Sequence, residues 1–126
     1  DGFKATGAKT LLVSGGFTFF TDRLAARFDF DEAAANTLEI AHGQLTGRVV
    51  PPIFGGEAKA ARLAAMRERH AGAGGISIAI GDGANDILML QAADVSIAYR
   101  AKPLVRGEAT YAIDHCGLDA VLNLFA

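Results

Sequence analysis

Two carboxylates and a cluster of glycines stand where an apolar stretch of this sequence meets a helical one. The segment 81–86, Gly-Asp-Gly-Ala-Asn-Asp, follows the uncharged, β-branched run 76–80, which is typical of a buried parallel strand. Asp82 and Asp86 could face one hard cation such as Mg²⁺, which prefers oxygen ligands. Asn85 and the free N–H groups at the start of the following helix could face an anion. A site that holds a cation and an anion together would handle a phosphate.

A second set of polar residues follows an earlier apolar run. Ser14, with the N–H groups of Gly15 and Gly16, could hold phosphate oxygens, and Lys59 in the first turn of a predicted helix could supply a positive charge. Each of these features also has an ordinary structural explanation. Gly-Asp-Gly is a common turn, Asp and Asn often cap helices, and a lysine on a helix is usually a solvated surface residue.

The elements that must position these residues alternate along the chain between strand and helix patterns. The sequence predicts strands over 9–13, 37–40, 43–50, 76–80, 94–99 and 109–113, and helices over 18–28, 57–70, 87–93, 101–108 and 118–125. A turn is expected at His42-Gly43, with His42 on the surface. Strands alternating with helices predict a mainly parallel sheet covered on both faces, with ligands beyond the carboxyl ends of its strands. Ser14 and Asp82 both lie at such ends, so this fold can bring them together.

The first long helix carries an aromatic stripe. Phe19, Phe20, Leu24 and Phe28 recur at helical spacing, and we expect them to face the core.

Composition limits the classes of protein to consider. The 126 residues suit one domain or part of one, and 51% of them are hydrophobic, enough for a packed core. A net charge of −2 without a long basic run argues against unspecific nucleic-acid binding. Because Cys116 is the single cysteine, an intrachain disulfide and a cysteine zinc cluster are excluded. The sequence shows neither an apolar run of membrane-spanning length nor a signal-peptide pattern, so no membrane association and a cytoplasmic location are expected.

Several segments together resemble a known family. They are Val13–Phe20, Ala35–Ile40, Lys59, segment 81–86 and Ala98–Pro103, in this order along essentially the whole chain. They are similar to the phosphoserine phosphatases, a group within the haloacid dehalogenase superfamily. The resemblance implies an α/β three-layer sandwich with a mainly parallel, Rossmann-like sheet, Mg²⁺ as cofactor, O-phosphoserine as substrate and a place in serine biosynthesis.

The resemblance also implies roles for individual residues. Ser14 and Gly15 match the motif that binds the substrate phosphoryl group, and Lys59 matches the lysine that neutralises charge on that group and on the nucleophile. Asp82 matches a Mg²⁺ ligand, and Asp86 supports the metal site, either through water or through an indirect hydrogen bond. Asn85 matches a position that contacts substrate. Phosphoryl transfer depends mostly on such positioning and electrostatic stabilisation.

One motif of the family has no counterpart in residues 1–126. The motif is Asp-x-Asp-x-Thr or Val after an apolar strand, and it supplies the nucleophile and the general acid and base. Asp1 does not replace it, because no apolar strand precedes it and Phe3 stands where the second Asp would be. Asp29 and Asp31 have the spacing but follow a helix. The cap that grips the serine part of the substrate is also missing. We therefore expect a single partial domain, the C-terminal part of a core, that is inactive alone.

The missing strand has a structural consequence. In the superfamily it lies in the centre of the sheet, between the strands that end at Ser14 and Gly81. Without it, two open edges should remain, and such edges tend to pair with another chain. We expect a rearranged sheet, a homo-oligomer, or an apolar patch covered by a complementing chain.

Rival interpretations remain at this point. The chain could belong to a superfamily phosphatase for another small phosphomonoester, or act as a non-catalytic module that binds Mg²⁺, phosphate or a protein. A nucleotide-binding Rossmann domain would want Gly-x-Gly-x-x-Gly after its first strand, which Ser14-Gly15-Gly16 does not supply. An ion-pumping ATPase shares segment 81–86, but no transmembrane segment is present.

Overall fold

The computed structural model describes residues 2–125, and Asp1 lies outside the described residues. The predicted strands and helices are present with shifted boundaries, but an additional strand precedes residue 37 and residues 118–125 form a 3₁₀ helix. The strands are β1 (Leu11–Phe17), β2 (Glu32–Asn36), β3 (Leu38–Ala41), β4 (Gln44–Val49), β5 (Ile78–Gly81), β6 (Val95–Tyr99) and β7 (Tyr111–Ile113). The helices are α1 (Gly2–Ala5), α2 (Thr18–Phe28), α3 (Gly56–His70), α4 (Ile87–Ala92) and α5 (Pro103–Arg106), with 3₁₀ helices η1 (Ala84–Asp86) and η2 (Leu118–Phe125).

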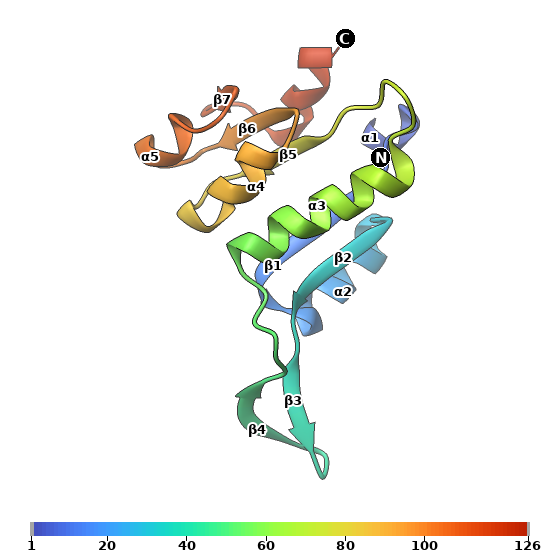
Figure 1. The fold of residues 1–126 in the computed structure, drawn as a ribbon, viewed down its shortest axis with the longest axis vertical. Helices are drawn as coiled ribbons and strands as arrows, with labels where there is room; N and C mark the ends of the chain where they lie inside the picture. The colour runs from blue at the N-terminus through green and yellow to red at the C-terminus, as the bar shows by residue number, and fades with distance from the viewer. Residues whose placement is uncertain (1, 126) are drawn as a thin grey trace.

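Parallel strands form two separate sheets, which confirms the mainly parallel α/β prediction. β1 pairs with β2, and β5, β6 and β7 form a three-stranded sheet in that order. Within residues 2–125, no ladder joins β1 to β5, so the arrangement is open, as expected for a sheet that lacks its central strand. Helix α3 lies across the space between the two sheets in Figure 1.

The buried core lies around the three-stranded sheet. Its members are apolar side chains from β5, α4, β6 and α5: Ala79, Met89, Leu90, Ala98 and Val105. Leu63 of α3 packs against this cluster, and so does Val13 of β1. The core thereby links the two sheets through α3 and the end of β1, and it holds the carboxyl ends of β1 and β5 near each other.

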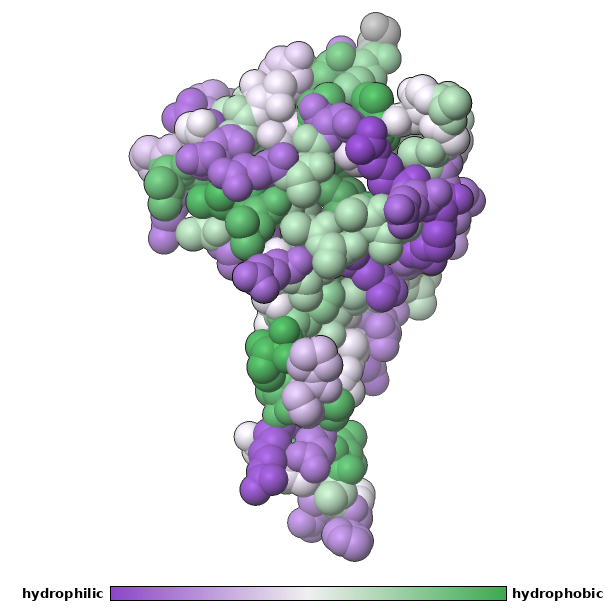
Figure 2. Space-filling view, viewed as in Figure 1, coloured by the Kyte–Doolittle hydropathy of each residue, from purple (hydrophilic) through white to green (hydrophobic). Residues whose placement is uncertain are grey.

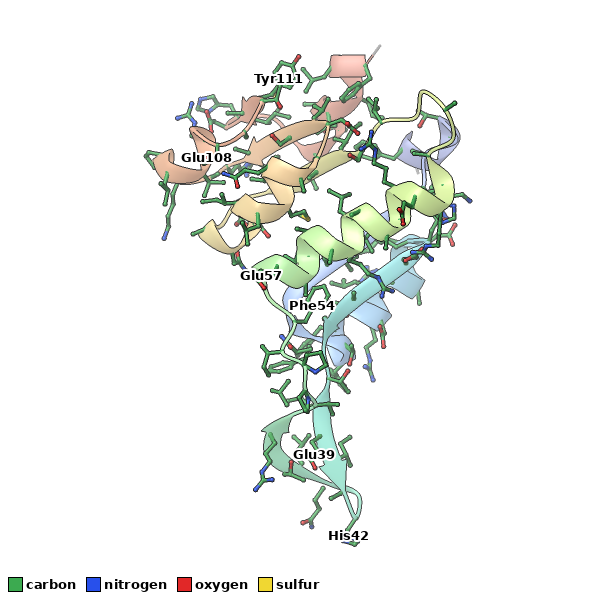
Figure 3. The ribbon with its side chains drawn as sticks, in the orientation of Figure 1. Glu39, His42, Phe54, Glu57, Glu108 and Tyr111 are labelled. Carbon is green, nitrogen blue, oxygen red and sulfur yellow. The ribbon has the colours of Figure 1, made fainter. Side chains whose placement is uncertain are left out.

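The antiparallel hairpin β3–β4 forms an arm that projects away from the rest of the molecule (Figure 1), with His42 at its tip (Figure 3). This confirms the predicted turn and the exposed position of His42, whose φ is +53°. Apolar surface lies along the arm between polar residues (Figure 2), and Ile40 and Leu45 are 66% and 65% exposed. The strand predicted over 37–40 proved to be one side of this arm, and a separate strand, β2, precedes it.

The prediction for the aromatic stripe of α2 was wrong. Phe19, Phe20, Leu24 and Phe28 are all exposed, and Phe20 is 61% exposed. Helix α2 instead turns Thr21, only 4% exposed, toward the body of the molecule. A small side chain on this face lets the helix approach the sheet closely, so the bulky stripe at every fourth position faces outward.

Ion pairs fasten the far end of α3 to β2. The Glu32 carboxylate lies 2.7 Å from Arg69 and 3.6 Å from Arg62, with His70 at 3.7 Å. The hydrogen bond from Arg69 holds the pKa of Glu32 below its usual value. This anchoring fixes the direction of the helix whose first turn carries Lys59. Among residues 2–125, no helix has the length and apolar composition needed to cross a bilayer.

Candidate active site

A cavity of about 490 Å³ opens at the carboxyl ends of β1 and β5 and at the first turn of α3. It brings together every site residue predicted from the sequence. The lining residues are Val13, Ser14, Gly15, Gly16, Lys59, Ile80, Gly81, Asp82, Asn85, Asp86 and Met89. The expected meeting of two strand ends is therefore found, with residues from four segments on one surface.

Ser14, Gly15 and Gly16 form a bulge on the edge of this cavity. The pairing of β1 with β2 passes from Val13 opposite Ala34 to Phe17 opposite Asn36, so four steps on β1 match two on β2. The Ser14 hydroxyl accepts a hydrogen bond from the Gly16 N–H at 2.9 Å. A Cβ at Gly15 would lie 3.6 Å from the Asn85 amide nitrogen, and one at Gly16 would lie 3.1 Å from the Ser14 hydroxyl. Glycine at position 16 therefore lets the backbone lie close to the Ser14 hydroxyl, whereas a Cβ at position 15 would make only ordinary contact.

Lys59 is buried at the base of the cavity, although a helical lysine is usually solvated. The residue is 4% exposed, and its Nζ donates a hydrogen bond to Asp86 Oδ1 at 2.7 Å. A buried ammonium is tolerated where a carboxylate compensates for its lost hydration. The charge of Lys59 is therefore held in place rather than free to move with a flexible side chain.

Asp86 uses both carboxylate oxygens within the protein. While Oδ1 accepts from Lys59, Oδ2 accepts from the backbone N–H groups of Asp82 and Gly83, each at 3.2 Å. A Cβ at Gly81 would lie 2.6 Å from the Asp86 Cβ, so the close approach of these segments requires glycine. Asp86 thus holds the loop that carries Asp82 and, at the same time, orients Lys59.

Asp82 and Asn85 are exposed at the mouth of the cavity. The Asp82 carboxylate takes part in none of the ion pairs formed by residues 2–125, so its oxygens remain available to a ligand. Within that same range, no group of three or more His, Cys, Asp or Glu side chains is placed to hold a metal ion together. The donor set fits Mg²⁺ in part: Asp82 offers one carboxylate, and further oxygens would have to come from water or from another segment.

Sequence reasoning gave no role to Asn36, which the structure connects to the site. Asn36 ends β2, is 7% exposed, and donates a hydrogen bond to the carbonyl of Gly15. The available signal was a single amide after the run Ala33-Ala34-Ala35, at the carboxyl end of a strand.

A second, mostly apolar cavity of about 430 Å³ lies between the two sheets, next to the first one. Leu11 and Val13 of β1 line one side, Ile78 and Ile80 of β5 line the other, and Met66 of α3 closes one face. Within residues 2–125, β1 and β5 each have one edge without a strand partner, and these edges face a common apolar space that opens toward Ser14 and Asp82.

Comparison with known proteins gives a consistent result. The family model for haloacid dehalogenase-like hydrolases matches residues 3–91. A phosphoserine phosphatase of Albidiferax ferrireducens is 45% identical over 97% of this chain, and one of Vibrio cholerae is 40% identical over 97%. The chain spans 53% and 37% of the length of these two relatives, respectively.

Solved structures resemble this one closely. A probable phosphoserine phosphatase from Vibrio cholerae, in unliganded form, superimposes with a TM-score of 0.88 at 39% identity, covering 94% of this chain and 37% of the other. A phospho-aspartyl intermediate analogue of phosphoserine phosphatase gives a TM-score of 0.87 at 31% identity, covering 98% of this chain and 59% of the other. With the family model matching well over half of its residues, the chain belongs to the haloacid dehalogenase-like hydrolase family.

Proposed function

We propose that residues 1–126 form one partial core domain that supplies the phosphate-binding half of a Mg²⁺-dependent phosphoserine phosphatase. The reaction would be hydrolysis of O-phosphoserine to serine and phosphate, in the cytoplasm and as part of serine biosynthesis. The observation that carries this proposal is the single cavity lined by Ser14, Gly15, Lys59 and Asp82. Relatives named phosphoserine phosphatase, at 40–46% identity over nearly the whole chain, support the substrate.

Each residue has a distinct task in this proposal. The Ser14 hydroxyl and the N–H of Gly15 bind phosphoryl oxygens, and Asn85 contacts the substrate at the cavity mouth. The Lys59 ammonium, fixed by Asp86 at 2.7 Å, offsets negative charge on the phosphoryl group as it is transferred. Preorganisation matters here, because a charge that is already positioned needs no rearrangement in the transition state.

Asp82 is the proposed Mg²⁺ ligand, and Asp86 supports it by holding the backbone of the same loop. When bound, Mg²⁺ would neutralise phosphoryl charge and orient the phosphoryl group for in-line attack. With one carboxylate available from these residues, Mg²⁺ affinity should be weak unless another segment adds oxygen ligands.

The remaining carboxylates would come from a complementing strand. We propose that the apolar cavity between β1 and β5 accepts a strand whose carboxyl end brings an Asp-x-Asp pair to Ser14 and Asp82. The two facing, unpaired edges and the apolar lining support this occupant. Without such a strand, residues 2–125 bring no Asp-x-Asp pair to the cavity, and the chain should not turn over substrate.

The test measures phosphate release from O-phosphoserine. We expect none above background from the chain with Mg²⁺, and measurable release after addition of a peptide that carries an apolar strand followed by Asp-x-Asp-x-Thr. Removing Mg²⁺ with EDTA should abolish that release. A chain that carries both Ser14→Ala and Lys59→Ala should release no phosphate when the peptide is added. Turnover by the chain alone at enzyme-like rates would contradict the proposal that a complementing strand supplies the reacting carboxylates. Equal release from unrelated phosphomonoesters would contradict the substrate.

A further inference from the structure

Asn36 is a buried amide that pairs with backbone groups of two separate segments. Its Nδ2 donates hydrogen bonds to the carbonyl of Gly15 and to the carbonyl of Phe54, both at 3.0 Å. Its Oδ1 accepts a hydrogen bond from the N–H of Phe54. The side-chain amide of Asn36 thus pairs with the backbone N–H and C=O of Phe54, as a residue of a neighbouring strand would. The second N–H of the Asn36 amide donates to the Gly15 carbonyl.

The bond to Gly15 falls where β1 leaves the β2 register. Ser14, Gly15 and Gly16 bulge out of the regular pairing, and the Asn36 side chain gives the Gly15 carbonyl a partner there. The carbonyl of Gly15 and the N–H of Gly16 belong to one planar peptide unit, so fixing the first sets the direction of the second. Asn36 therefore helps to set the direction of the Gly16 N–H, which donates to the Ser14 hydroxyl on the edge of the cavity.

The bonds to Phe54 act on the other side of the cavity. Phe54 lies between the projecting arm and the first turn of α3, as Figure 3 shows with Phe54 and Glu57 labelled. The next residue, Gly55, accepts a hydrogen bond from the Lys59 N–H at 2.9 Å. The same side chain thus fixes the start of the helix that carries Lys59.

We infer that Asn36 is a positioning residue that sets the spacing between the anion-binding bulge at Ser14–Gly16 and the ammonium of Lys59. This inference rests on the proposed function. It gives a positioning role to Asn36, a residue that takes no direct part in the proposed reaction. Asn36 does not line the cavity, so it acts through Gly15 and Phe54. A residue that merely closed the base of the arm would affect Phe54 and leave Gly16 and Lys59 unchanged.

The test compares two substitutions with a matched control. Asn36→Asp keeps the size and the acceptor for the Phe54 N–H but removes both donations, and Asn36→Ala removes all three bonds. Asn123→Ala changes an exposed Asn in η2 and serves as control. Amide exchange and ¹H–¹⁵N spectra of the 126-residue chain report on Gly16, Phe54 and Lys59 separately.

We expect both Asn36 variants to shift the Gly16 and Lys59 amide resonances. Exchange at Phe54 should accelerate about tenfold in Asn36→Ala, the equivalent of one ordinary hydrogen bond. The Asn123→Ala spectrum should match the unmodified chain at these positions. If Asn36→Asp fails to fold because its buried carboxylate faces the carbonyls of Gly15 and Phe54, Asn36→Ala still gives the comparison. Changes confined to Phe54 and its neighbours in the arm would overturn the inference.

A functional measurement separates this inference from the proposed reaction. In the peptide-complemented chain, Asn36→Ala, which adds no charge, should raise the inhibition constant of inorganic phosphate and lower kcat for O-phosphoserine by about tenfold or more, because small misplacements of a site are costly. Unchanged phosphate inhibition and kcat in a responsive chain would refute the positioning role. If the unmodified chain shows no hydrolysis at all, the proposed function fails, whereas the amide measurements still decide the role of Asn36.

Discussion

Lys59 and Asp86 make the pair on which the site depends most directly. Both side chains are nearly inaccessible, with 5% and 10% of their surfaces exposed, and their charges lie 2.7 Å apart. Two charges buried together offset each other's desolvation, whereas one left alone does not. The stability of the fold and the position of the Lys59 charge are therefore linked at this point.

Replacing Lys59 should destabilise the chain, because Asp86 would keep a buried charge without its partner. For Lys59→Met we expect the free energy of unfolding to fall by about 3 kcal/mol. Lys102→Met removes an exposed lysine and should change it by no more than about 0.5 kcal/mol. Urea unfolding followed by circular dichroism measures both. In an Asp86→Asn background the Lys59→Met change should cost much less, and equal costs in the two backgrounds would show that the pair is uncoupled.

Asp31 should make the stability of the chain depend on acid pH. Hydrogen bonds from the backbone and hydroxyl of Thr10 lower the pKa of Asp31 from 3.8 to about 2. A carboxyl with a depressed folded-state pKa stabilises the fold above its unfolded pKa, and this contribution is lost as pH falls through the folded value. Stability should therefore decline between about pH 4 and pH 2, and Asp31→Asn should flatten this part of the curve. Thermal unfolding across this range tests it, and an unchanged slope in the variant would contradict the assignment.

Residue types and spacing predicted the members of the cavity, but not how they contact one another. Ser14 and Asp82 were identifiable because each follows an apolar strand, and the carboxyl ends of β1 and β5 lie together although the two strands belong to separate sheets. The ion pair between Lys59 and Asp86 joins residues 27 positions apart in the sequence, and the hydrogen bonds between Asn36 and Phe54 join residues 18 positions apart. Such contacts depend on tertiary packing, which no local pattern records.

At the scale of elements, α2 shows how a correct period can lead to the wrong face. The spacing of Phe20, Leu24 and Phe28 correctly predicted a helix, and apolar stripes usually face the core. Here the buried side belongs to Thr21, because a bulky stripe would hold the helix away from the sheet. The period of a pattern fixes the type of an element, whereas the space available to it decides which side is buried.

The buried face of α2 carries an unpaired hydroxyl. Thr21 Oγ1 is inaccessible and has no hydrogen-bond partner among residues 2–125. Thr21→Val keeps the shape and removes the polar atom, so we expect the free energy of unfolding to rise by about 1 kcal/mol. Leu24→Ala on the exposed side should change stability much less than the removal of a core leucine would, because this side chain is 43% exposed. Thermal melts of both variants test the orientation of the helix, and a loss of stability in Thr21→Val would show that the hydroxyl has a partner.

For the whole molecule, the decisive feature is the space between β1 and β5. Each strand is paired in parallel on one side only, and each turns its other edge toward the apolar cavity. We expect a strand entering there to run parallel to both neighbours, so that its carboxyl end reaches Ser14 and Asp82, and to be apolar where it meets the lining of the cavity. Its N–H and C=O groups would satisfy two edges that are otherwise exposed, which makes this insertion more favourable than pairing at one edge alone.

A peptide with five or six consecutive Val, Ile and Leu residues, with lysines outside the strand for solubility, should therefore stabilise the chain. We expect a higher unfolding temperature that depends on peptide concentration, because a ligand that binds only the folded state shifts the equilibrium. Amides of β1 and β5 should gain protection from exchange while those of the β3–β4 arm do not. A control peptide with a central proline lacks one N–H group and should have a much weaker effect.

If a second copy of the chain covers the space instead, sedimentation should show an oligomer that the Val, Ile and Leu peptide dissociates. A monomer whose β1 and β5 amides ignore the peptide would mean that the two edges do not accept a strand.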